Sequence, residues 1–191
     1  MTEGTICTWA QNDEVMEAYH NTEWGFPSYD DNYLFELLNL EGAQAGLSWK
    51  IILHRRHAYQ EAFFGFDIDR CAAMTDEEIT EILQNPGIIR NKLKVNGVRK
   101  NAKSALRVQA EFGSLANYFW QFTDNKPIVN HRKSDKELPA KDELSEKISK
   151  DLRKRGFTFV GPVIIYSYLQ AIGIIDDHVT TCPYHTDNRS K

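Results

Sequence analysis

The sequence predicts an all-α protein, and three observations support this prediction. Apolar residues recur every three or four positions along most of the chain, which is the period of one helix face. Thr75 and Glu78 have the spacing of a helix-capping box. Outside residues 155–161, no stretch alternates apolar and polar residues convincingly over six positions. The length of 191 residues suits one unit, 1–191, with two helical lobes. We expect one lobe to hold the termini and early helices, and the other a central bundle with a hairpin near 155–163.

In the first half of the chain we expect helices over residues 13–21, 31–39 and 44–64, each with apolar residues at helical spacing. The capping box then begins another helix, whose apolar face includes Ile79 and Ile82. That helix ends at Asn85-Pro86-Gly87, since this combination favours a turn.

The second half begins with a long basic helix over residues 88–112, followed by a short aromatic helix over 114–122. Residues 123–142 are polar and contain two prolines, so we expect an exposed connection. An amphipathic helix over 143–154 and a further helix over 162–172 complete the prediction. Pro162 suits the first turn of the last helix, where no backbone N–H is needed.

The composition indicates a folded protein of a reducing compartment. The chain is 41% hydrophobic and 12% aromatic, which is enough for a packed core, and it has no apolar run long enough to cross a membrane. The N-terminus shows no secretion signal. Three cysteines exclude a dense disulfide framework, so we expect a cytoplasmic protein in which Cys71 is a buried helix residue.

The charge is unevenly distributed. The net charge of −4 argues weakly against a nucleic-acid partner, but residues 82–110 carry seven basic residues and no acid. A second basic cluster lies within 147–155. Local basic faces rather than total charge determine phosphate affinity. Each cluster by itself is also typical of an ordinary solvated helix face.

Two Cys/His pairs lie at opposite ends of the chain: Cys7 with His20, and His178 with Cys182. Zinc in structural sites is bound by four such ligands. The spacing matches no standard zinc finger, and buried structural cysteines and histidines are an equally good interpretation. A metal at these four residues would join the two termini.

The turn over residues 155–161 joins a basic helix to the helix that begins at Pro162. Backbone N–H groups at the start of that second helix could bind a phosphate without reading base sequence. A glycine followed by a proline between two helices also occurs in ordinary helical bundles, so both interpretations stay open.

Glu41 stands among apolar residues, followed by Gly42, Gly46 and Trp49. The glycines permit close approach of a ligand or a helix, and the tryptophan offers a flat apolar face. Trp9, Tyr19 and Trp24 supply more aromatic surface. These neighbouring glycines and aromatic residues make Glu41 a candidate buried acid in a pocket, although most glutamates at helix ends face solvent.

Together these residues resemble the type I 3-methyladenine DNA glycosylases, which are base-excision repair enzymes of the helix-hairpin-helix superfamily. The resemblance runs from about residue 5 to 184, and its combination of motifs is highly specific. The matching segments are Cys7 to Trp9, Tyr19 to Gly25, Leu40 to Trp49, Gly87 to Arg90, Lys154 to Gly161, and Asp177 to His178 with Cys182.

The resemblance implies a helix-hairpin-helix glycosylase fold with one structural Zn²⁺. Its ligands would be Cys7, His20, His178 and Cys182, which leave no open position for catalysis. The implied base-binding residues are Trp9, Tyr19, Glu41 and Trp49, with Glu41 as the candidate catalytic residue. We expect Glu41 to serve selection and positioning more than rate.

The implied reaction is hydrolysis of the N-glycosidic bond of 3-methyladenine in alkylated duplex DNA, after the base is flipped out. We expect a monofunctional enzyme, because the helix after Gly161 has no lysine to act as an amine nucleophile. Asp176 and Asp177 lie near the superfamily's catalytic position, but we assign neither a role.

The expected partners are alkylated double-stranded DNA and free 3-methyladenine as product, with no membrane and a monomeric state. We expect phosphate contacts from Phe159, Val160 and Gly161, and from some of Arg90, Lys92 and Lys94, with Arg90 and Lys92 as the first candidates. Two alternatives remain at this stage: a zinc-stabilised DNA-binding module without activity, and a glycosylase for other alkylated purines.

Overall fold

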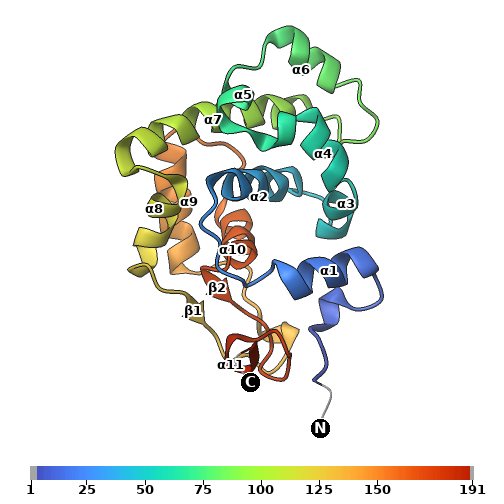
Figure 1. Ribbon diagram of the computed structural model, residues 1–191, viewed down its shortest axis with the longest axis vertical. Helices are drawn as coiled ribbons and strands as arrows, with labels where there is room; N and C mark the ends of the chain where they lie inside the picture. The colour runs from blue at the N-terminus through green and yellow to red at the C-terminus, as the bar shows by residue number, and fades with distance from the viewer. Residues whose placement is uncertain (1–3, 190–191) are drawn as a thin grey trace.

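The structure is a computed structural model that describes residues 4–189 and is mostly helical (Figure 1). Residues 1–3, on which the expectation about a secretion signal partly rests, lie outside the described residues. The α-helices are α1 (Glu14–Thr22), α2 (Asp31–Ala43), α3 (Trp49–His54), α4 (Arg56–Ala62), α5 (Ile68–Ala72), α6 (Asp76–Ile82), α7 (Lys92–Phe112), α8 (Leu115–Trp120), α9 (Glu143–Lys154), α10 (Pro162–Ala171) and α11 (Thr186–Arg189). Short 3₁₀ helices are η1 (Thr8–Ala10), η2 (Phe64–Phe66), η3 (Gln121–Thr123) and η4 (Asp135–Glu137).

The core is built around α2, which packs against α10 and α7 in the middle of the molecule (Figure 1). Every residue of α2 from Leu34 to Ala43 is buried. The long helix α7 also packs against α5, and α10 packs against α9. Because α2 is enclosed on all sides, a polar residue near its end must be held inside the protein. The proposed division into two lobes stays a prediction.

Side-chain caps explain where many helices begin. Asp13, Asp30, Ser114 and Asp142 each accept a hydrogen bond from a backbone N–H in the first turn of the following helix. Such caps satisfy donors that have no partner inside the helix. The predicted capping box at Thr75 is confirmed, since both reciprocal bonds with Glu78 are present at the start of α6.

The prediction of one helix over 44–64 is wrong. Residues 44–48 form a turn in which Gly46 has a φ of +79°, and Ser48 then caps α3. A second break at Arg55 separates α3 from α4. Left-handed backbone at a glycine ends a helix readily. Likewise, the helix predicted over 88–112 begins at Lys92, because Asn91 caps it.

The connection over residues 123–142 is exposed or half-buried throughout, as predicted, but it also holds secondary structure that the sequence did not indicate. It contains η4 and the strand β1 (Ile128–Val129), which pairs in parallel with β2 (Ile175–Asp176). This two-residue ladder is too short to show the alternation that predicts a strand. The ladder fixes the connection beside the C-terminal segment (Figure 1).

The turn between α9 and α10 lies against the middle of the molecule. Phe159 has a φ of +56°. It packs closely on Gly42: a Cβ atom added to that glycine would lie only 3.1 Å from the Cβ of Phe159. Ser149 donates a hydrogen bond of 2.6 Å to the carbonyl of Val160. Pro162 occupies the first turn of α10, as predicted.

The two ends of the described chain lie together. A Cβ placed on Gly4 would lie 2.5 Å from the carbonyl oxygen of Thr181, so the N-terminal segment packs directly on the C-terminal one. Within residues 4–189, no helix combines the length and the apolar character needed to cross a membrane.

Candidate active site

A cavity of about 390 Å³ lies between the N-terminal segment, α1, α2, α3, η4 and α10. Its walls hold all four residues that the sequence singled out as base-binding: Trp9, Tyr19, Glu41 and Trp49. The other lining residues are Met16, Trp24, Gln44, Asp135, Leu138, Ser167 and Gln170. A volume of this size suits one small planar ligand.

Glu41 stands in the last turn of α2 and is only 4% exposed. Burial raises the pKa of its carboxyl to about 8, because the charged form loses its solvation. Among the described residues, no hydrogen-bond donor contacts this carboxyl, and burial alone accounts for its raised pKa. A buried acid without a partner is expensive for stability, so its presence indicates a functional site.

Aromatic rings form much of the wall around this acid. The centroid of Tyr19 lies 5.4 Å from that of Trp49 and 6.3 Å from that of Trp9. The indole N–H groups of Trp9 and Trp49 are buried and have no hydrogen-bond partner among the described residues. Burial, and secondarily the nearby Glu41, raise the pKa of Tyr19 well above its usual value, so its hydroxyl stays protonated.

Asp135 is a wall residue that the sequence did not indicate. Its Oδ2 accepts hydrogen bonds from the backbone N–H of Thr8 at 2.6 Å and of Trp9 at 3.2 Å. Its Oδ1 is buried and has no partner in the part of the chain that the structure describes. Asp135 lies in the connection predicted to be exposed, so no local signal pointed to it. Gln44, by contrast, lies within the Glu41 to Trp49 motif, and Met16 precedes Tyr19 by one turn of α1.

Three of the four predicted zinc ligands converge. The ligand atoms of Cys7, His20 and Cys182 all lie within 4.8 Å of one another, and all three residues are buried. The Nε2 of His20 is 3.6 Å from the Sγ of Cys182. Tetrahedral zinc with ordinary Zn–N and Zn–S bonds places such a pair about 3.6 Å apart. The Nδ1 of His20 donates to Asn21 at 2.7 Å, which leaves Nε2 unprotonated and able to bind a metal.

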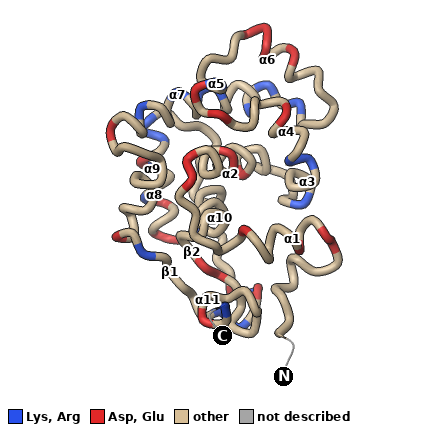
Figure 2. Tube along the Cα trace, viewed as in Figure 1, with Lys and Arg blue, Asp and Glu red and all other residues tan. Residues whose placement is uncertain are grey.

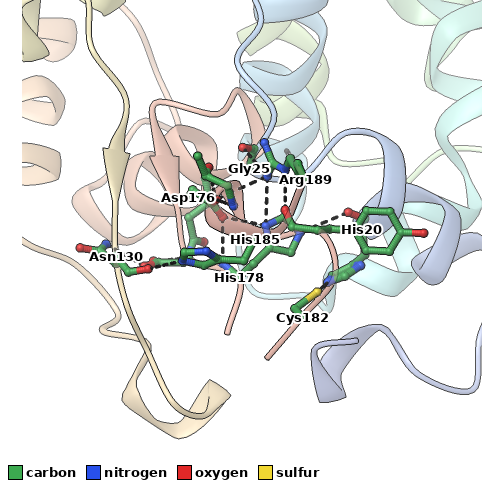
Figure 3. Close-up of polar contacts among 12 residues, drawn as sticks. His20, Gly25, Asn130, Asp176, His178, Cys182, His185 and Arg189 are labelled. Atoms are coloured by element: carbon green, nitrogen blue, oxygen red, sulfur yellow. Dashed lines mark hydrogen bonds and ion pairs between the residues drawn. The ribbon is translucent and has the colours of Figure 1, made fainter. Parts of the chain in front are cut away.

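His178, the fourth predicted ligand, lies beside this cluster (Figure 3), with its ring centroid 4.6 Å from that of His20. Its Nδ1 donates to Asp176 at 2.7 Å, and its Nε2 is 3.4 Å from the His20 carbonyl oxygen. A carboxylate on one ring nitrogen is the usual outer partner of a metal-binding histidine. Cys7, His20 and Cys182 therefore fit three positions of a tetrahedral metal, whereas Nε2 of His178 lies outside this cluster and faces the His20 carbonyl.

Neither Asp176 nor Asp177 faces the cavity. Asp177 is fully buried and accepts hydrogen bonds from Arg132 at 2.7 Å, Gln170 at 2.8 Å and Asn130 at 2.8 Å. Asp176 binds His178 and the N-terminal end of α11. Both carboxylates thus hold the C-terminal segment in place.

The predicted DNA-contacting residues differ in accessibility. Arg90 and Lys92 are exposed, and Figure 2 shows basic segments on α3 and along α7. The side chain of Val160 is buried, and Phe159 is half-buried, so that turn would offer mainly backbone. The expectation that Lys94 binds phosphate is not supported by its contacts. Its Nζ donates to the carbonyls of Ala43 at 3.0 Å and Ala45 at 2.6 Å, at the end of α2.

Comparison with known proteins identifies the family of the chain. The family model described as "Methyladenine glycosylase" matches residues 9–185. A mostly helical fold whose cavity places a buried acid among aromatic walls is typical of base-excising glycosylases, and the chain belongs to the methyladenine glycosylase family.

Particular relatives cover nearly the whole chain. The DNA-3-methyladenine glycosylase of Haemophilus influenzae is 41% identical over 182 residues, which are 95% of this chain and 98% of that protein. A crystal structure of 3-methyladenine DNA glycosylase I superposes with a TM-score of 0.92 at 41% identity, covering 95% of this chain and all of that one. A tyrosine-to-phenylalanine variant of such an enzyme, solved in complex with 3-methyladenine, has a TM-score of 0.91 at 34% identity, with 94% and 96% covered.

Proposed function

We propose that the protein hydrolyses the N-glycosidic bond of 3-methyladenine in alkylated duplex DNA. The observation that carries this proposal is a buried carboxyl, Glu41, that has no hydrogen-bond partner among the described residues and lies in a cavity walled by Trp9, Tyr19 and Trp49. This carboxyl needs a partner that a base edge would supply. A base inside a duplex cannot enter such a cavity, so it must be flipped out of the stack.

Charge gives the pocket its preference for a damaged base. Methylation at N3 makes the adenine ring cationic while it is attached to the sugar. The aromatic walls attract a cation, and a cation beside Glu41 favours its ionised form over the neutral form that burial imposes. Normal adenine is neutral and offers no compensation for ionising a buried acid. The raised pKa of Glu41 therefore favours the cationic methylated base over neutral adenine.

Glu41 is proposed to select and position the base rather than to accelerate bond cleavage. A carboxylate against a cationic ring stabilises the ground state, whereas the positive charge moves to the sugar in the transition state. The leaving base is already activated by its charge. Little acid catalysis is then needed to break the bond.

The reaction is proposed to stop at the abasic site. A lyase activity needs a free amine, and α10 (Pro162–Ala171) contains none. Lys94 is held by two backbone carbonyls, and its pKa is lowered by burial. It lies near the end of α2 as a structural group rather than as a nucleophile.

A structural Zn²⁺ bound by Cys7, His20, His178 and Cys182 is proposed to join the N-terminal segment, which carries Trp9 and Tyr19, to the C-terminal segment. The donor set and the distance between His20 and Cys182 suit tetrahedral zinc. Four protein ligands leave no open position, so the metal contributes stability and the residues of the cavity carry the reaction.

DNA is proposed to contact the backbone at Phe159, Val160 and Gly161 and the side chains of Arg90 and Lys92. Gly161 caps α10, which places N–H groups of that helix where a phosphate could bind. The protein is proposed to act as a cytoplasmic monomer.

The decisive experiment incubates the purified protein with methylated duplex DNA and identifies the released base. Release of 3-methyladenine supports the proposal, and release of other alkylated purines in preference to it would favour the broader glycosylase. DNA binding without any release would indicate a non-catalytic module. The variant Glu41→Gln tests the pocket directly, because it keeps the size of the side chain and removes its charge.

A further inference from the structure

A second cluster of metal-binding side chains lies outside both the cavity and the Cys7 cluster. It consists of His131 in the connection after β1, and His185 and Asp187 in the C-terminal segment. The ligand atoms of these three residues all lie within 4.8 Å of one another. None of the three lines the cavity around Glu41.

The tautomer of His185 suits metal binding. Its Nε2 lies 2.8 Å from the backbone carbonyl of Asn130, which can only accept, so Nε2 carries the proton (Figure 3). Nδ1 is therefore unprotonated, and it points to the side of Asp187. A histidine whose outer nitrogen donates to a carbonyl is the usual arrangement at a metal. His185 is buried, so its ring is held in this orientation.

The spacing of the three ligands is close to that of a metal site. The Nε2 of His131 is 2.8 Å from the Oδ2 of Asp187, and the Nδ1 of His185 is 3.9 Å from the same oxygen. Bonds of about 2.1 Å place neighbouring ligands about 2.9 to 3.4 Å apart and opposite ligands about 4.2 Å apart. An ion at this position would replace the weak 3.2 Å bond that Nδ1 of His185 accepts from the Asp187 backbone.

The surroundings leave space for an ion with water ligands. The side chains of His131 and Asp187 are 61% and 57% exposed, so solvent can complete the coordination. Two imidazoles and one carboxylate are the ligands that zinc and similar divalent transition metals prefer. Magnesium and calcium would choose oxygen ligands instead.

We propose that His131, His185 and Asp187 form a second site, which binds a divalent transition metal such as Zn²⁺. The ion would fasten the connection after β1 to the C-terminal segment. The backbone already joins these segments there, since the N–H of Thr180 donates to the carbonyl of Arg132 at 2.8 Å. The ion thus closes a junction that is largely organised without it.

Calorimetric titration of the zinc-loaded protein with further Zn²⁺ tests this site. We expect one additional Zn²⁺ per chain. The variants His131→Ala and Asp187→Asn should each weaken its binding by at least about tenfold, since each removes a direct ligand. His57→Ala is the matched control, because His57 is an exposed histidine 3.2 Å from the carboxylate of Glu61. It should bind the additional ion as the unaltered protein does.

Substitution with Co²⁺ distinguishes the two sites. Cobalt at the Cys7 cluster would give thiolate charge-transfer absorption, whereas cobalt at His131, His185 and Asp187 would give only the weaker bands of nitrogen and oxygen ligands. The proposal is overturned if no additional ion binds at millimolar Zn²⁺, or if His131→Ala and Asp187→Asn bind it as tightly as the control. Circular dichroism of each variant establishes that it is folded; both altered side chains are largely exposed.

Discussion

The carboxylate of Asp135 accepts a hydrogen bond from the backbone N–H of Trp9 at 3.2 Å, across 126 residues of sequence. The same oxygen accepts from the N–H and the hydroxyl of Thr8. Asp135 thereby fixes the segment that carries one aromatic wall of the cavity. Trp9 also lies 5.3 Å from His20 by ring centroids, so the pocket wall and the Cys7 cluster share one support.

Asp135→Ala should loosen this wall. Loss of the hydrogen bonds to Thr8 and Trp9 is expected to cost about 1–3 kcal/mol. We therefore expect weaker binding of 3-methyladenine, measured by quenching of tryptophan fluorescence. Lys136→Ala, one residue away and exposed, serves as the control and should bind normally. Equal affinity in both variants would contradict a supporting role for Asp135.

Glu41→Gln should weaken binding of free 3-methyladenine by about threefold to tenfold, because the amide cannot reproduce the hydrogen bond of the carboxyl to the neutral base, and such a bond contributes about 0.5–1.5 kcal/mol. Turnover of methylated DNA under saturating conditions should fall less than affinity does. Single-turnover kinetics and base titration provide the two measurements. Our assignment of Glu41 to selection is wrong if turnover is abolished while affinity for the free base is unchanged.

The raised pKa of Glu41 predicts how stability depends on pH. The carboxyl titrates near 4.5 when the chain is unfolded and near 8 in the folded protein. Between these values the folded state binds the extra proton, so the contribution of Glu41 to stability falls as pH rises from about 4.5 to 8, and it is constant above that range. Glu41→Gln should remove this decline. Melting temperatures of both proteins at pH 5 and pH 8 test this prediction. The melting temperature of the variant, relative to that of the unaltered protein, should be higher at pH 8 than at pH 5.

Cys182→Ser should release the proposed zinc. A structural metal contributes several kcal/mol, and the melting temperature is expected to fall by roughly 10 °C. Cys71→Ser is the matched control. Cys71 is buried in α5, as predicted, and its Sγ donates to the carbonyl of Phe63, a bond that serine can keep. Elemental analysis should find one zinc fewer in Cys182→Ser only. Unchanged zinc content in Cys182→Ser would exclude Cys182 as a ligand.

Arg90→Ala should weaken DNA binding at all sequences alike. Each lost phosphate contact reduces the slope of log K against log salt by about 0.9. Titrations of duplex DNA at several salt concentrations measure this slope. Lys126→Ala removes an exposed charge from the connection that follows η3 and should leave the slope unchanged. An effect of Lys126 equal to that of Arg90 would show that only overall charge matters.

The sequence by itself determined most helices and the acid at the centre of the site. Caps such as Asp13, Asp30 and Thr75 act within three residues, so their signal is local and can be read directly. Glu41 and Trp49 lie in one short motif, and both line the same cavity because so few residues separate them. The missed break at Gly46 was also local, since glycine and a capping serine stand together there.

Only the tertiary structure decided which distant residues complete the site. Asp135 lines the cavity because β1 pairs with β2 and carries the connection back to the N-terminal segment. Lys94 serves the end of α2 rather than solvent because α7 packs on that helix. His131 meets His185 and Asp187 through the same return of the connection. Such contacts depend on how whole elements pack, and no pattern within a few residues encodes them.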